Sequence, residues 1–248
     1  MWDDRYVAHD YEFPYPTNAA AVAHPFETLD FVRRSPDDMH DRATAFHTEM
    51  DRRRSVRMIS DDPVPQALIE AAVRTASTAP SGAHQQPWRF VATQDHAVKR
   101  QIRAAAENAE RINYGADDER SAARMNDQWR NELAPLGTDW HEEFLEVAPW
   151  IVVLFEERYG IRSDGSKRTN YYVKESCGIA AGMFITALHH MGLATLTHTP
   201  SPMAFLSQLF GRPENERPFV LFPVGFPVDG CKVPTLRRKP LDDVLTIV

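Results

Sequence analysis

Four residues in one short stretch have the side chains to bind a phosphate group: Arg53, Arg54, Ser55 and Arg57. Guanidinium groups are planar forks that match phosphate oxygens, and a nearby serine hydroxyl adds a further hydrogen bond. A second basic group, residues 237–239, lies far away in the sequence. Arginine runs are also common on ordinary solvated surfaces. The first group therefore indicates a phosphate site only if other polar residues converge on it.

The segment Ala79–Trp88 is a second candidate, because it joins an amphipathic helix to an apolar strand through a rigid loop. Pro80 and Pro87 restrict the backbone, whereas Gly82 has no Cβ and lets a bound molecule approach closely. Ser81 precedes that glycine. The loop is therefore suited to hold a flat cofactor, although an ordinary helix-to-strand connection would have the same composition.

Two further segments carry groups that can act on a ligand. Thr197, His198 and Thr199 follow an expected strand and offer two hydroxyls and an imidazole. Residues 116–140 are highly charged and contain widely spaced large apolar side chains, a composition typical of a lid that is completed by its ligand. The alternative for His198 is an ordinary packed or surface histidine. The alternative for residues 116–140 is a solvated surface helix.

Composition limits the classes of protein. The 248 residues carry a net charge of -7, which argues against a general nucleic-acid binder. Cys177 and Cys231 are far apart and form no metal-ligand spacing, so neither a metal site nor a disulfide is expected. No signal peptide is visible, and the apolar stretch Ile179–Leu188 is too short to cross a bilayer. We expect a cytoplasmic protein without a membrane partner.

Hydrophobic periodicity predicts an α+β fold. Residues 1–36 are expected to be irregular, and the expected domains are an arm with the start of a helix, 1–45, and a main domain, 46–248. Neither the dinucleotide glycine pattern nor a phosphate-binding P-loop is present, so arginine side chains would have to hold a phosphate. The expected elements are helices over 36–53, 65–76, 96–112 and 171–191, strands over 88–93, 150–155, 194–199 and 219–226, and a turn-rich loop over 160–167.

Several motifs in the same order resemble the iodotyrosine deiodinase branch of the nitroreductase superfamily, over roughly four fifths of the chain from about Asp51. The motifs are Arg53-Arg54-Ser55-Val56-Arg57, Ala79-Pro80-Ser81-Gly82-Ala83-His84 with Pro87-Trp88, Ile112-Asn113-Tyr114, Thr197-His198-Thr199-Pro200, Pro223-Val224-Gly225 and Arg238-Lys239-Pro240. The resemblance implies a mixed sheet wrapped by helices around a long central helix. It also implies a domain-exchanged homodimer with a lid at about 110–145 and a C-terminal dimer arm at about 231–248.

The resemblance further implies an FMN-dependent reductive dehalogenase that removes halide from a halogenated tyrosine or a related halophenol. Ala83 would donate its backbone N–H to the substrate phenolate, and the Thr199 hydroxyl would lie near the flavin N5 as the second catalytic group. The electron donor or reductase is not identified. The implied FMN-binding residues are Arg53, Arg54, Ser55, Arg57, Ser81, Gly82, Thr197, His198, Thr199 and Arg238.

The chain departs from the family at the group that recognises the amino-acid part of the substrate. Glu110 and Tyr114 match two of its positions, but Glu142 stands where the family has a lysine, and the lid is about seven residues longer. A substrate carboxylate beside Glu142 would be repelled, which favours a halophenol with a cationic tail or with no carboxylate. Alternatively, Arg111, Arg120 or Arg124 replaces the missing charge and halotyrosine still binds.

Three other functions stay open at this point. A general NAD(P)H-dependent nitroreductase or quinone reductase would share the cofactor and the fold. The flavin-cleaving relative that makes a cobalamin base has an aspartate where Ser55 stands, which disfavours it. A non-catalytic flavin-binding sensor belongs to a different class, and slow reoxidation of its flavin by every aromatic acceptor would reveal it.

Overall fold

The computed structural model describes residues 27–115 and 127–248, and the chain divides into two compact units, Met1–Ala45 and Phe46–Val248. Helix α2 (Pro36–Asp51) begins in the first unit. Its first turn is stabilised by the Ser35 hydroxyl, which accepts a hydrogen bond from the Asp38 backbone N–H at 3.2 Å. Arg34 and Arg42 each contact Asp38 at 3.0 Å. The predicted helix over 36–53 is therefore confirmed, and it ends before Arg53.

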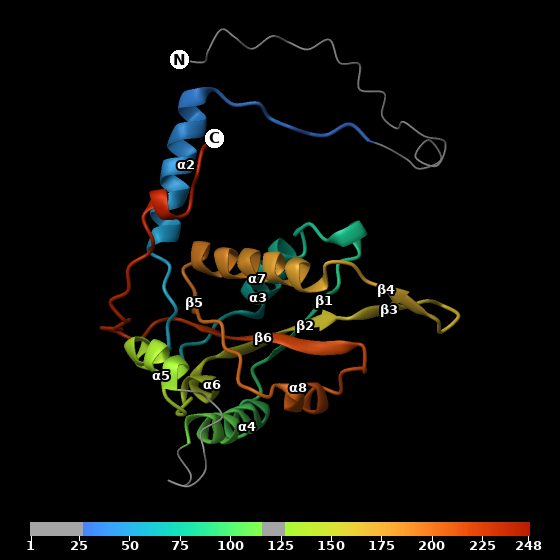
Figure 1. Cartoon of the computed structure of the whole chain (residues 1–248), viewed down its shortest axis with the longest axis vertical. Helices are drawn as coiled ribbons and strands as arrows, with labels where there is room; N and C mark the ends of the chain where they lie inside the picture. The colour runs from blue at the N-terminus through green and yellow to red at the C-terminus, as the bar shows by residue number, and fades with distance from the viewer. Residues whose placement is uncertain (1–26, 116–126) are drawn as a thin grey trace. The chain divides into compact units, whose positions relative to one another are not determined.

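A four-stranded sheet forms the centre of the second unit, with strand order β1-β2-β6-β5 (Figure 1). All of its strand pairs are antiparallel, and the mixed character implied by the resemblance is limited, among the described residues, to one parallel bridge between Ser55 and Thr195. Strands β3 and β4 form a separate hairpin where a turn-rich loop was predicted. The strands are β1 (Trp88–Thr93), β2 (Trp150–Glu157), β3 (Tyr159–Ile161), β4 (Lys167–Thr169), β5 (Ala194–Thr195) and β6 (Glu216–Gly225).

Helices cover both faces of the sheet, and strand β2 is buried from Trp150 to Glu156. Because successive side chains of a strand point to opposite faces, Val152 and Leu154 face one layer while Ile151 and Val153 face the other. Figure 1 shows α7 and α3 on one side of the sheet and α4 and α8 on the other. The helices are α3 (Gln66–Ala76), α4 (His96–Tyr114), α5 (Asp127–Leu133), α6 (Phe144–Val147), α7 (Val173–His190) and α8 (Ala204–Leu209), with short 3₁₀ turns η1 (Gly82–His84), η2 (Ala134–Leu136) and η3 (Leu241–Asp243).

Helix α7 is the predicted long helix, and its buried residues include Phe184 and Leu188. Burying a side chain of that size stabilises a fold by roughly 1.5–3 kcal/mol. The opposite side of α7 carries Gly178, Ile179 and Gly182, all exposed in the single chain; we call these three residues the open face of α7. No helix among the described residues is long and apolar enough to span a membrane.

Pro223 and Pro227 predict that the strand over 219–226 lies near an edge of the sheet, whereas β6 lies between β2 and β5. The prolines inside β6 are Pro218 and Pro223, and the sheet accommodates both without their N–H groups. Pro218 falls where the register against β2 shifts, and the Pro223 carbonyl accepts a hydrogen bond from the Thr195 hydroxyl at 2.7 Å. Strand β5 is only two residues long instead of the predicted six. Strand β6 is therefore central in the strand order, but β5 pairs with only two of its residues.

The predicted lid is described in part. Gly115, at φ 69°, ends α4 in the left-handed conformation, as the predicted break at 113–115 requires. Residues 116–126, with Arg120, Arg124 and most of the longer segment, lie outside the described residues. The described part consists of the end of α4, α5, η2 and the chain that leads into α6.

Candidate functional site

A strongly basic cavity of about 470 Å³ brings together the first arginine group and the second. None of the described residues that line it is acidic. It thus unites six of the ten predicted cofactor residues, although Arg238 lies about 180 positions from the first group. The residues that line this basic cavity are Arg53, Arg54, Ser55, Arg57, Leu133, Leu136, Leu196, Thr197, Pro234, Leu236, Arg237 and Arg238.

The chain around the arginines is held in place by backbone contacts. After α2 ends, the Val56 N–H donates to the Thr195 carbonyl at 3.1 Å, which ties the segment to β5. Arg238 donates to the Asp51 carboxylate at 2.8 Å and to the Arg53 carbonyl at 2.9 Å. Arg54 donates to the Pro234 carbonyl. Arg238 and Arg54 therefore fix the C-terminal segment beside the phosphate-binding candidates of the same chain.

Two arginines of this cavity, Arg53 and Arg57, lie in surroundings that disfavour their positive charge. Burial lowers the pKa of Arg53, and the positive charges of Arg238 and Arg54 lower it further. Burial also lowers the pKa of Arg57. Arginine nevertheless stays protonated in proteins, so several like charges are held close together. A bound anion would relieve this repulsion, and the arrangement fits a phosphate group.

A second cavity, of about 570 Å³, adjoins the first, because Arg57, Leu133 and Thr197 line both. Three carboxylates line it, from α4 and from the chain before α6, so we call it the acidic cavity. Residues predicted to contact the flavin and the substrate meet here. Its lining residues are Arg57, Glu110, Asn113, Tyr114, Trp129, Leu133, Thr138, Asp139, Glu142, Thr197, His198, Thr199 and Ser201.

Glu142 and His198 form a direct pair inside the acidic cavity. The Glu142 Oε2 lies 2.9 Å from His198 Nε2, and the two side chains are only 3% and 14% exposed. Burial raises the pKa of Glu142, the hydrogen bond from His198 opposes the rise, and the charges of Glu110 and Glu107 add to it. The side chain of His198 thus meets Glu142, which stands where the family has a lysine, and the predicted contact of His198 with the flavin stays a prediction.

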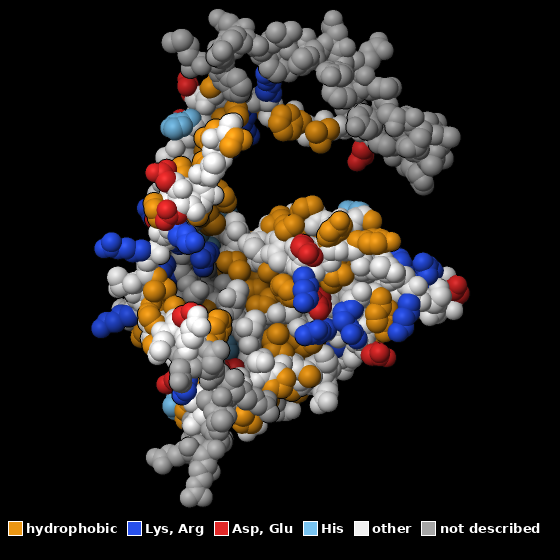
Figure 2. Space-filling model, in the orientation of Figure 1, with side chains coloured by type: hydrophobic (Ala, Val, Ile, Leu, Met, Phe, Trp, Pro, Cys, Tyr) orange, Lys and Arg blue, Asp and Glu red, His pale blue; other side chains and the backbone are white. Residues whose placement is uncertain are grey.

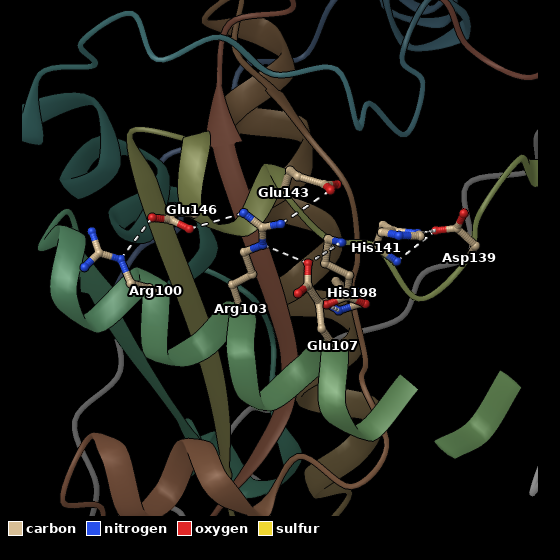
Figure 3. A network of polar contacts seen from close by, with 9 residues as sticks. Arg100, Arg103, Glu107, Asp139, His141, Glu143, Glu146 and His198 are labelled. Carbon is tan, nitrogen blue, oxygen red and sulfur yellow. Dashed lines mark hydrogen bonds and ion pairs between the residues drawn. The ribbon is translucent and has the colours of Figure 1, made fainter. Parts of the chain in front are cut away.

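Glu142 is held in place indirectly, because Arg103 of α4 binds the Glu107 carboxylate and Glu107 binds the Glu142 backbone. Figure 3 shows Arg103 between Glu107 of its own helix and Glu143 and Glu146. Its Nε lies 2.7 Å from the Glu107 carboxylate, and that same carboxylate oxygen accepts from the Glu142 backbone N–H at 3.0 Å. The backbone of Glu142 is thereby fixed to α4, and its side chain is directed to His198.

Glu110 is positioned by neighbours that the sequence prediction did not single out. Its Oε1 accepts hydrogen bonds from Asn113 Nδ2 at 3.2 Å and from the Ser201 N–H at 3.3 Å. The spacing of three residues on a helix places Asn113 beside Glu110, which is the signal that could have identified it. Burial raises the pKa of Tyr114, and the hydrogen bond from Thr138 opposes that rise. Asp139 is a further lining residue with no recognisable sequence signal, whereas Arg237 belongs to the second basic group.

The loop with Ser81, Gly82 and Ala83 does not line either cavity. It packs at the start of α7, where the Gly82 N–H lies 3.4 Å from the Ser176 hydroxyl, whereas Arg53 and Ile185 line a common hollow near the end of that helix. Nine residues of helix separate these two places, about 14 Å. One chain therefore does not bring the predicted flavin-binding loop to the arginines.

This loop has a constrained backbone. Ala83, His84 and Gln86 all have positive φ, between 48° and 53°, which costs of order 1–3 kcal/mol at each such residue. The Ser81 hydroxyl accepts from the Gln86 N–H at 2.9 Å and closes the turn. As a result, the Ala83 N–H lies on an exposed, rigid turn. Another cavity, of about 590 Å³ between α3 and β1, contains none of the predicted site residues.

Comparison with known proteins places the chain in a class. A model of the nitroreductase family matches residues 50–226. A nitroreductase with bound FMN from Bacteroides fragilis superposes with a TM-score of 0.58 at 20% identity, covering 82% of this chain and 98% of that one, a likeness of fold. The chain belongs to the nitroreductase family.

Within that family, similarity is strongest to one group. An iodotyrosine deiodinase from Haliscomenobacter hydrossis is 48% identical over 86% of this chain and 92% of its own length, and one from Danio rerio is 44% identical over 88% and 72%. A crystal structure of an iodotyrosine deiodinase bound to FMN and 3-iodo-L-tyrosine has a TM-score of 0.69 at 26% identity, covering 82% of this chain and all of that one. The predicted family branch, iodotyrosine deiodinases, is confirmed.

Proposed function

We propose that the protein is an FMN-dependent reductive dehalogenase that acts on a halogenated tyrosine or a related halophenol. One observation carries the proposal: a cavity rich in arginine adjoins, along Arg57 and Thr197, a cavity that could hold a small polar aromatic molecule. The FMN phosphate would bind Arg53, Arg54, Ser55 and Arg238, with the ring system extending past Thr197. Similarity to the iodotyrosine deiodinases supports the same assignment.

The chain's own groups would orient the substrate. The Ala83 N–H would donate to the phenolate, Glu110 and Tyr114 would contact its side chain, and the Thr199 hydroxyl would donate a hydrogen bond beside the flavin N5. Bound FMN supplies the redox chemistry, so that two electrons and a proton replace the carbon–halogen bond by carbon–hydrogen and halide leaves. A preformed N–H at the phenolate is worth most where water is excluded.

A homodimer is part of this proposal, because the Ser81–Ala83 loop lines neither the basic cavity nor the acidic cavity of its own chain. The open face of α7 is free of neighbours in the described chain: a Cβ added at Gly178 or Gly182 would meet nothing within 4 Å. In Figure 2, hydrophobic side chains gather on the visible surface over α7. The C-terminal residues Leu241 and Val244 are each 65% exposed. A second copy packed on these surfaces would bury them and supply the loop.

The test of the proposed function is a single-turnover reaction. The holoenzyme is reduced with dithionite without oxygen and mixed with iodotyrosine, iodotyramine or 2-iodophenol, while flavin reoxidation and free iodide are measured together. Iodide in proportion to flavin oxidised is the expected result. No iodide from any of them, together with rapid reoxidation by a nitroaromatic compound, would instead establish a general nitroreductase.

Two further expectations stay proposals. Both cysteines are free thiols, as expected in a reducing compartment, and a cytoplasmic location stays a prediction.

The physiological electron donor stays unidentified; a direct assay with NADH and NADPH would decide whether a separate reductase is needed.

A further inference from the structure

The acidic cavity has an excess of negative charge at the place where the tail of a substrate would lie. Its carboxylates are Glu110, Asp139 and Glu142, and its cations, among the described lining residues, are Arg57 and His198. A proton shared between Glu142 and His198 contributes the same charge wherever it resides. The described residues that line the cavity therefore carry a net negative charge even when that pair holds a proton.

Neither cation is placed to receive a substrate carboxylate. The His198 ring nitrogen Nε2 lies 2.9 Å from the Glu142 carboxylate. The His198 N–H donates to the Leu221 carbonyl at 2.8 Å, and the His198 carbonyl accepts from the Leu221 N–H at 2.9 Å, so the backbone of His198 and its ring are both held in place. The ring of Phe144 packs edge-on against it at 5.7 Å. Arg57 also lines the basic cavity, where a phosphate would compete for it. Among the described lining residues, a carboxylate tail would thus displace an existing pair or find no cation that is free to receive it.

An ammonium tail finds the opposite environment. Glu110 lies on α4 beside the segment at Ser201, where its Oε1 is held by Asn113 and by the Ser201 N–H. Asp139 also lines the cavity and is exposed, and its Oδ1 accepts a hydrogen bond from the His141 N–H at 2.8 Å. Charge-assisted hydrogen bonds from an ammonium group to such carboxylates are the strong kind.

We propose, on the basis of the proposed function, that the acidic cavity selects halophenols with a cationic side chain and no carboxylate, the halogenated arylethylamine class, over zwitterionic halotyrosine. Glu142 and His198 together are the specificity-determining pair. Glu142 stands where a cation could have paired with a carboxylate, Glu110 and Asp139 supply the negative charge, and His198 is a positioning residue that keeps Glu142 in the buried wall.

The experiment separates binding from reaction. Dissociation constants of 3-iodotyramine, 3-iodotyrosine and 2-iodophenol are measured by flavin absorbance changes with the oxidised holoenzyme, which requires no turnover. Variants are Glu142→Gln, Glu142→Lys and His198→Asn. Glu132→Gln is the matched control, because Glu132 is an exposed lid carboxylate that lines neither cavity.

The expected result is at least about tenfold tighter binding of iodotyramine than of iodotyrosine, or about 1.4 kcal/mol. Glu142→Gln should narrow this ratio, Glu142→Lys should reverse it, and Glu132→Gln should leave it unchanged. His198→Asn removes the basic partner of Glu142 and should widen the ratio, with 2-iodophenol binding retained. Tighter binding of iodotyrosine by the native protein, or a ratio unaffected by Glu142→Lys, would overturn the inference. Failure of the proposed function is seen separately, as absence of iodide from every reduced mixture.

Discussion

Single residues decide whether the basic cavity binds a phosphate. Replacing Arg53 by Ala should raise the dissociation constant of FMN by about 10- to 100-fold, because charge-assisted contacts to a phosphate contribute roughly 1.5–3 kcal/mol each. Fluorescence titration of the apoprotein with FMN measures this effect. The matched control is Arg52→Ala, since Arg52 is exposed and does not line that cavity. An equal loss in both variants would show that the cavity is not the phosphate site.

Glu142 also makes the stability of the fold depend on pH in a defined direction. Burial raises its pKa above the ordinary value of 4.5, against the hydrogen bond from His198 and with Glu107 and Glu110 adding to the rise. The native state therefore holds this proton to a higher pH than the unfolded chain does. The stabilising contribution is present below pH 4.5 and is lost as the pH rises through the native pKa.

The comparison of Glu142→Gln with the native protein isolates this effect. As the pH increases from 4.5 to neutrality, the native protein should lose stability relative to the glutamine variant, which keeps the hydrogen bond but cannot ionise. Urea unfolding at several pH values measures the difference. Glu132 is an exposed carboxylate, so the difference in free energy of unfolding between Glu132→Gln and the native protein should not change with pH. If this difference did not change with pH for Glu142→Gln either, the effect assigned to burial would be contradicted.

At the scale of elements, the η1 turn depends on one glycine. A Cβ at Gly82 would lie 2.5 Å from the Tyr171 carbonyl oxygen, a backbone atom that cannot move aside cheaply. Gly82→Ala should therefore lower the free energy of unfolding by about 1–3 kcal/mol. The adjacent Ala83→Gly is the control: at φ 48° a glycine is at least as well accommodated, so stability should be unchanged or slightly higher. Chemical denaturation distinguishes the two, and equal losses would refute the steric explanation.

The elements that the sequence predicts well are those with strong local periodicity. Helices α3, α4 and α7 and strands β1 and β2 follow from alternating or 3.6-residue apolar patterns that burial requires. Strand β6 was placed wrongly because Pro223 and Pro227 suggest an edge, while a register shift at Pro218 and a side-chain hydrogen bond to the Pro223 carbonyl accommodate the prolines of the strand in the centre. The three-residue strands β3 and β4 are too short to show any period.

The candidate site was predictable only in part. Its arginines and hydroxyls lie in local motifs that match a family, so their convergence in adjoining cavities followed from the resemblance. The pairing of Glu142 with His198 did not, because the two residues are 56 positions apart and meet only after β2, α7 and β5 have been placed. Side-chain pairing across the fold has no local sequence pattern to reveal it.

For the whole molecule, the proposed dimer links assembly to cofactor binding. Gly178→Leu adds a side chain where the single chain offers open space, so the isolated fold should tolerate it, whereas a second copy packed on α7 would clash. We expect sedimentation analysis to show a shift from dimer toward single chains, with FMN retention falling in parallel because the Ser81–Ala83 loop of the other copy is withdrawn. Ala67→Leu, on the exposed side of α3, is the matched control and should change neither. Arg53→Ala should lose FMN and remain a dimer, so a Gly178→Leu protein that stays dimeric, or becomes single chains with FMN fully retained, would show that the site is complete within one chain.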